Sequence, residues 1–261
     1  YVTGGIAALL IARATIFSSP LYPAFGLGLF AVLACIEYLS SCRQRWVLAA
    51  GVCTGAASLF RWDFALYSGL AVLGTVLLVP RHWAALKGSD WRARRNAAVC
   101  FVAGASAALP IWVWWTAAGG AGNVLDQAFV FHIVVSPPFR RLPYPNLLAV
   151  FSPLLGGPLL LQNVYLRLQD ALAFYGTLLV YVAASAYLLV TGLRRKGRFA
   201  EQQAKLFPLL GFGALLFLQA ANRFDTAHVL PSLLIAIMLL CLFLEHEAPI
   251  ALAAGQPLRW A

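Results

Sequence analysis

The sequence predicts an all-α fold: a polytopic transmembrane bundle of about seven to eight spans, with a long extracytoplasmic loop that carries an interfacial or re-entrant helix. Two observations predict this fold. Of the 261 residues, 62% are hydrophobic and only 11% are charged, whereas an average soluble domain has roughly 25% charged residues. The apolar residues also form separate runs, and the mean hydropathy of the chain is +0.80. We therefore expect a single transmembrane domain over residues 1–261.

A membrane span needs about 20 apolar residues, and somewhat shorter spans are tolerated. The candidate spans are Val2–Ile16, Leu21–Ser40, Trp46–Phe60, Phe64–Val79, Ala97–Ala117, Ala171–Thr191, Leu206–Ala221 and Val229–Leu244. As helices, Trp46–Phe60 and Leu206–Ala221 reach only about 22–24 Å across a hydrocarbon core of about 30 Å. We expect both to stop below the outer surface; the alternative is that tilted neighbours or local thinning accommodate them.

Most of the 19 basic residues fall into three loops. These loops contain Arg43 and Arg45, the basic residues of segment 81–95, and those of segment 194–205. Because consecutive spans cross in alternate directions, all three loops lie on one side, which the positive-inside rule makes cytoplasmic. The net charge of +10 thus follows from membrane topology, and we expect no nucleic-acid partner.

The loops on the opposite, extracytoplasmic side contain arginines and aspartates but no lysine. Arginine without lysine favours bidentate recognition of phosphate or carboxylate. Two motifs on this side share the form Arg-aromatic-Asp: Arg61-Trp62-Asp63 and Arg223-Phe224-Asp225. Each follows one of the short spans, and a charge at bilayer depth costs roughly 2.5–3.5 kcal/mol, so such groups usually serve a function. The alternative for either motif alone is a local ion pair that closes a helix end.

His228 lies three residues after Asp225. On a helical turn, the two side chains would face the same way and could act as an acid–base pair, share a metal or hydrogen-bond. One carboxylate and one imidazole are too few for a metal site, so we assign no metal ligand and leave a divalent cation as an alternative cofactor.

The extracytoplasmic segment between about residues 119 and 170 contains a proline-rich stretch, Ser136–Pro145, that precludes a regular helix. Arg140 and Arg141 lie in it, and we expect this stretch to be a mobile cover over a bound phosphate. Leu147–Leu161 is the expected interfacial or re-entrant segment. The three tryptophans Trp112, Trp114 and Trp115 predict an aromatic belt at the end of the preceding span.

Two glycine patterns lie within apolar runs. Gly51-x-x-x-Gly55 predicts close packing of two helices. Gly26-x-Gly28 starts a dinucleotide fingerprint but has no preceding strand, so we discard it. The sequence has no P-loop, Cys-x-x-Cys, His-Glu-x-x-His or Gly-x-Ser-x-Gly motif, and the usual soluble enzyme classes lose their support.

The stretch Gly55–Tyr67, preceded by Ser19–Pro23 and followed by Asn222–Pro231, resembles bacterial GT-C superfamily glycosyltransferases of the family 39 and Rgt-like kind. The resemblance implies a multi-pass protein of the bacterial inner (plasma) membrane, in contact with membrane lipids. It also implies transfer of a sugar from a polyprenyl-phosphate donor to a lipid, glycan or protein acceptor on the extracytoplasmic face. The acidic catalytic motif of that family would lie before Tyr1, so we expect a fragment that lacks its N-terminal part and is inactive alone.

This interpretation assigns roles to the charged residues. The expected ligands of the donor are Arg61, Arg140, Arg141 and Arg223, and the expected catalytic residues are Asp63, Asp225 and His228. A carboxylate would activate the acceptor hydroxyl, and arginines would stabilise the departing phosphate. The alternative is a secondary transporter or lipid flippase that uses the same recessed groups for an anion or for protons. A non-catalytic membrane scaffold is a third interpretation.

Overall fold

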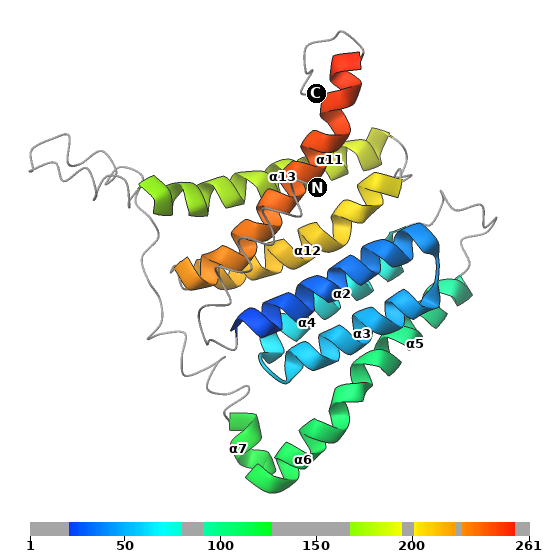
Figure 1. The fold of residues 1–261 in the computed structure, drawn as a ribbon, viewed down its shortest axis with the longest axis vertical. Coiled ribbons are helices and arrows are strands. Elements are labelled where there is room, and N and C mark those ends of the chain that lie inside the picture. Colours follow the sequence, from blue (N-terminus) through cyan, green and yellow to red (C-terminus); the bar gives the residue numbers. More distant parts are fainter. Residues whose placement is uncertain (1–20, 80–90, 127–167, 195–200, 223–225, 254–261) are drawn as a thin grey trace, which may run out of the picture.

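The computed structural model describes residues 21–79, 91–126, 168–194, 201–222 and 226–253 (Figure 1). Almost all of these residues are helical and none of them forms a strand, which confirms the all-α prediction for this part of the chain. The helices are α2 (Leu21–Ser41), α3 (Gln44–Ser58), α4 (Trp62–Leu78), α5 (Trp91–Ala105), α6 (Leu109–Gly119), α7 (Ala121–Leu125), α11 (Thr177–Arg194), α12 (Glu201–Asn222) and α13 (Thr226–Ala253). A 3₁₀ turn, η1 (Ser106–Ala108), joins α5 to α6, and a π-helical turn, η4 (Leu172–Gly176), precedes α11.

Several of these helices have the length and composition of membrane spans. In the described residues, 4 helical stretches are long and apolar enough to cross a membrane: Leu21–Ser41, Trp91–Gly119, Leu168–Arg194 and Gln203–Ala221. Trp62–Leu78 and His228–Leu244 are shorter apolar helices. Each predicted span from Leu21 onward coincides with a helix, whereas Val2–Ile16 lies outside the described residues. The structure therefore supports a helical membrane protein.

The longest helices pack side by side around two apolar clusters (Figure 1). In the larger cluster, Phe212 of α12 is fully buried and stacks on Phe25 of α2, with ring centroids 6.2 Å apart. Phe64 of α4 belongs to the same cluster, so α12 packs against both α2 and α4. The smaller cluster joins α2, α3, α4 and α5 and includes the buried Tyr38 and Phe101.

Helices α3 and α5 approach so closely that their backbones touch. A Cβ on Gly51 would overlap the carbonyl oxygen of Phe101, and one on Gly104 would overlap that of Leu48. At Gly55, a Cβ would lie 2.5 Å from the carbonyl oxygen of Ala105. Small residues permit this approach because membrane helices gain affinity from close packing rather than from a hydrophobic effect between them. The predicted role of Gly51-x-x-x-Gly55 is confirmed.

The helix ends next to the basic loops lie together at one end of the bundle. Leu39 of α2, Val79 after α4 and Ala204 of α12 form one buried cluster there. Arg94 Nη1 of α5 donates to the carbonyl oxygen of Leu77, 2.7 Å away, and so binds one of the free carbonyls at the end of α4. The arrangement agrees with the alternating directions that the sequence predicts, and the side of the membrane on which this end lies stays a prediction.

One expectation about helix length is wrong. α12 has 22 residues and begins at Glu201, so it is about 33 Å long and exceeds the 16-residue helix predicted for Leu206–Ala221. Its end below the outer surface stays a prediction. The apolar run begins only at Leu206, but the polar residues before it continue the helix, and Gln203 and Ala204 are buried against its neighbours. By contrast, α3 has 15 residues and is as short as predicted.

Candidate functional site

The candidate site begins at the tight connection between α3 and α4. Arg61 caps the N-terminus of α4 with an extended backbone, and Asp63 lies in the first turn of that helix. The positive end of the helix dipole favours a carboxylate at this position. Asp63 is only 8% exposed, and a buried carboxylate must be paired and hydrogen-bonded to be tolerated. The local sequence Arg-Trp-Asp meets both needs.

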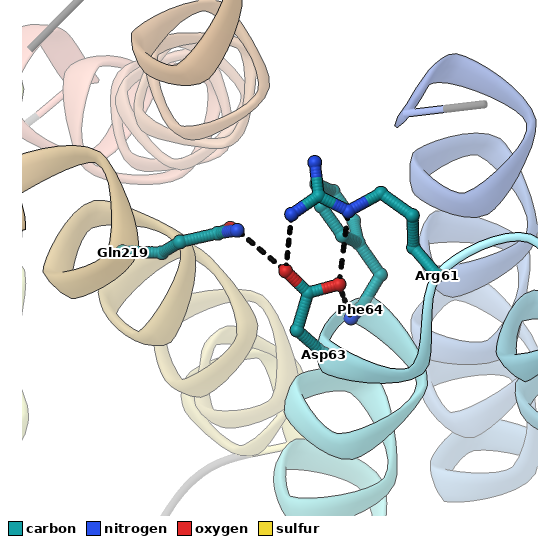
Figure 2. Close-up of polar contacts among 4 residues, drawn as sticks. All are labelled: Arg61, Asp63, Phe64 and Gln219. Atoms are coloured by element: carbon teal, nitrogen blue, oxygen red, sulfur yellow. Dashed lines mark hydrogen bonds and ion pairs between the residues drawn. The ribbon is translucent and has the colours of Figure 1, made fainter. Parts of the chain in front are cut away.

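Three residues donate hydrogen bonds to Asp63 (Figure 2). Arg61 binds as a fork, with Nε 3.1 Å from Oδ1 and Nη2 2.5 Å from Oδ2. The backbone N–H of Phe64 donates to Oδ1 at 3.0 Å. Gln219 of α12 donates from Nε2 to Oδ2 at 2.5 Å. Asp63 is thus a hub that joins a helix start, an arginine and a second helix.

The sequence interpretation missed Gln219. The sequence feature that could have identified it is a side-chain amide within the apolar run Leu206–Ala221. An unpaired polar group is costly there, so a partner for the amide could have been expected. The bond from Gln219 to Asp63 places the C-terminal end of α12 beside the N-terminal end of α4. The helix ends that adjoin the two Arg-aromatic-Asp motifs therefore lie side by side.

Arg61 keeps donors available for a ligand. Its bonds to Asp63 use the Nε–H and one Nη2–H of the five N–H groups of a guanidinium. Figure 2 shows its third nitrogen, Nη1, pointing away from Asp63. Cζ lies 5.2 Å from the centroid of the Phe64 ring, and the side chain is 24% exposed. Such a partly exposed, pre-oriented guanidinium is suited to binding phosphate or carboxylate oxygens.

An open cleft of about 600 Å³ lies between the α3–α4 connection and the helices α6 and α7. Its lining residues are Ser58, Leu59, Phe60, Arg61, Trp62, Asp63, Trp112, Trp115, Ala118, Gly119 and Val124. A cleft of this size is within the range of small-molecule sites, which are usually apolar and aromatic with a few polar groups. Arg61 and Asp63 are the charged residues among those that line it.

The far wall of the cleft is attached to the near wall by one described hydrogen bond. Trp112 Nε1 of α6 donates to Ser58 Oγ at the end of α3, 2.9 Å away. Ser58 Oγ donates in turn to the carbonyl oxygen of Gly55 at 2.6 Å. Trp115 packs edge-on against Trp112, with ring centroids 5.6 Å apart. Trp112 is therefore a wall of the cleft, and the aromatic belt of Trp112, Trp114 and Trp115 stays a prediction.

The other predicted site residues are placed only in part. His228 is half-buried in the first turns of α13. Asp225, Arg223, Arg140 and Arg141 lie outside the described residues, so their roles stay predictions. Within the described ranges, no group of three or more His, Cys, Asp or Glu side chains has the arrangement of a metal site.

No protein-family model, curated protein or solved structure matches the chain. We therefore infer the function from the residues of the cleft between the α3–α4 connection and the helices α6 and α7.

Proposed function

We propose that the chain belongs to a membrane glycosyltransferase of the GT-C kind, which takes a sugar from a polyprenyl-phosphate donor on the extracytoplasmic face of the bacterial inner membrane. The observation that carries the proposal is Arg61, held by Asp63 beside a cleft with tryptophan walls. The acceptor is a lipid, a glycan or a protein.

Arg61 suits the phosphate of the donor. When the bond between sugar and phosphate breaks, negative charge builds up on the departing phosphate, and fixed N–H donors stabilise that charge without having to reorganise. Arg61 is fixed in this way, because two of its nitrogens are bonded to Asp63. The free N–H groups of Arg61 can then bind phosphate oxygens with little loss of side-chain freedom.

Asp63 suits a positioning role in this mechanism. Its oxygens already accept hydrogen bonds from Arg61, Phe64 and Gln219, so both oxygens are occupied in holding Arg61 and α12. Activation of the acceptor hydroxyl then falls to another group. Asp225 and His228 are the candidates that the sequence offers.

The tryptophans suit the sugar. Trp62, Trp112 and Trp115 line the cleft together with Arg61, and indole faces pack well against the C–H faces of a sugar ring. A sugar phosphate fits within about 600 Å³. The outer side of α6 is apolar and exposed, with Val113 66% and Trp114 65% accessible, which suits a prenyl chain lying along it in the lipid.

Activity of the intact protein in nanodiscs tests the proposal. Purified polyprenyl-phosphate sugars are supplied as donors, and release of polyprenyl phosphate is measured. We expect Arg61→Lys to lower kcat/KM at least about tenfold, or about 1.4 kcal/mol of transition-state stabilisation, because an ammonium keeps the charge but lacks the fork. The matched control is Arg45→Lys, since Arg45 lies at the opposite end of α3 and stacks over Trp46; we expect it to keep wild-type activity.

Two results would contradict the proposal. One is an Arg61→Lys variant that is well folded and within about twofold of the wild-type rate, a difference of only about 0.4 kcal/mol. The other is an intact protein that releases no polyprenyl phosphate from any donor but moves an anion across proteoliposomes. The second result would favour a transporter.

A further inference from the structure

We propose that Gln219 is a positioning residue that, through Asp63, fixes the direction in which Arg61 presents its free N–H groups to the cleft. The identity of the cleft's ligand rests on the proposed function, whereas the positioning of Arg61 does not.

Orientation matters here because net charge cannot hold the anion. Asp63 lies within ion-pair distance of Arg61 and cancels its charge. Affinity for a phosphate must then come from directed N–H groups on the far side of the guanidinium. A neutral amide is the suitable partner for this pair, because Gln219 adds a donor to Asp63 without adding a charge that would compete with Arg61.

The three donors divide the two oxygens of Asp63 between them. Oδ1 accepts from Arg61 Nε and from the backbone of Phe64, which belongs to the same helix start. Oδ2 accepts from Arg61 Nη2 and from Gln219. If Gln219 is removed, Arg61 is the described donor that remains on Oδ2. Oδ2 is then bound to the arginine that it has to position and to no other described helix. Gln219 is therefore the group that anchors this oxygen to a separate helix.

The helix that carries Gln219 is a rigid support. α12 is held in the core by Phe212 and Leu216, which are 0% and 1% exposed, against α2 and α4. A site residue is well oriented when its supporting groups lie on packed helices rather than loops. Gln219 lies 156 residues from Asp63 in the chain, so the bond sets the position of α4 against α12 as well as the direction of Arg61.

The alternative is that Gln219 merely holds two helices together. Gln203 provides the matched control, because it lies on the same helix, is 7% exposed and donates from Nε2 to Tyr187 Oη of α11 at 3.1 Å. This bond is at the opposite end of α12 from the cleft. Replacing either glutamine by methionine keeps the length of the side chain and removes the interhelical hydrogen bond described for it.

The first measurement reads Arg61 directly. In the intact, ¹⁵N-arginine-labelled protein in micelles, the Nε–H signal of Arg61 is identified by its absence from Arg61→Lys. We expect Gln219→Met to speed solvent exchange of this proton at least about tenfold, because the carboxylate that holds it is no longer anchored, and Gln203→Met to leave it unchanged. Equal exchange in the wild type and Gln219→Met would overturn the proposal, and so would an equal increase in both methionine variants. If Gln219→Met fails to fold, Gln219→Leu is used in the same comparison.

The second measurement reads the consequence for binding, with farnesyl monophosphate as the probe and the fluorescence of the cleft tryptophans as the signal. We expect Gln219→Met to raise Kd about tenfold, or about 1.4 kcal/mol, and Gln203→Met to leave it unchanged. The variant Asp63→Asn/Gln219→Met should bind no more weakly than Asp63→Asn, because Gln219 acts through Asp63. If the losses of binding free energy from Asp63→Asn and Gln219→Met add up in the double variant, Gln219 does not act through Asp63. A wild type that fails to bind the probe, together with faster exchange in Gln219→Met, would contradict the proposed function and leave the positioning intact.

Discussion

At the scale of the residue, the buried hydroxyl of Tyr181 is satisfied as Asp63 is, by partners within the protein, because no water is at hand. Tyr181 of α11 is 4% exposed, and its Oη donates to the carbonyl oxygen of Ser232 in α13 at 2.6 Å. Ser232 Oγ donates in turn to the carbonyl oxygen of Gly213 in α12 at 3.2 Å. The network joins the three helices α11, α12 and α13. Glycine is needed at position 213 because a Cβ there would overlap Tyr181 Oη.

We predict that Tyr181→Phe lowers the free energy of unfolding by about 0.5–1.5 kcal/mol, the usual range for one hydrogen bond between membrane helices. Tyr181→Leu should cost more, because it also removes the ring that packs against Phe217, 6.0 Å away between centroids. Reversible unfolding by SDS in mixed micelles measures both losses. Equal stability of Tyr181→Phe and the wild type would show that the hydroxyl contributes nothing.

At the scale of the element, the position of the cleft depends on how closely α5 approaches α3. The two helices touch along Gly51, Gly55 and Gly104, and α6 continues from α5 through the turn η1 to form the far wall of the cleft. A shift of α5 therefore moves Trp112 relative to Ser58 and changes the width of the cleft.

We predict that Gly104→Ala separates α5 from α3 and costs at least about 2 kcal/mol, because its Cβ meets the backbone of Leu48 rather than a side chain that can move aside. Gly74→Ala is the control. It also lies in an apolar helix, α4, but nothing lies within 4 Å of its added Cβ, so we expect stability to be kept or slightly raised. Thermal unfolding in micelles compares the two variants. Similar melting temperatures for both would mean that the α3–α5 contact is loose.

At the scale of the whole molecule, the charges are divided between the two ends of the bundle. The α2–α3 loop with Arg43 and Arg45, and the start of α5 with Arg94, lie at one end. The cleft with Arg61 lies at the other end, where α3 stops and α4 starts. The positive-inside rule predicts that the basic end lies in the cytoplasm and that the cleft faces the outside.

We predict that a single cysteine at position 42 reacts with an impermeant thiol reagent only from the cytoplasmic side, and that Gly122→Cys in a cysteine-free background reacts only from outside. All of the native cysteines are free, and Cys42 lies in the loop between α2 and α3 with φ of 55°. Glycine is the suitable replacement for it in that background, since this backbone conformation favours glycine. Gly122 is exposed on α7 beside the cleft, with nothing within 4 Å of an added Cβ. Labelling of Cys42 from outside would place the cleft in the cytoplasm and contradict an extracytoplasmic transferase.

The sequence by itself determined the helical membrane character and the places of the helices from Leu21 onward, and it offered the pairing of Arg61 with Asp63 as one of two interpretations. These features are local: hydropathy adds up along a run, and two residues two positions apart at a helix start are neighbours in any fold. It also pointed to the glycines of α3, because small residues in an apolar run have few other uses.

Only the tertiary structure decided which residues complete the site. Gln219 reaches Asp63 across 156 residues, and Trp112 reaches Ser58 across 54. Such pairs depend on which helices are neighbours and on how far each is rotated about its axis. Neither property can be predicted from the hydropathy of one segment. The start of α12 at Glu201 was decided in the same way, because burial of Gln203 and Ala204 against other helices extends α12 beyond its apolar run.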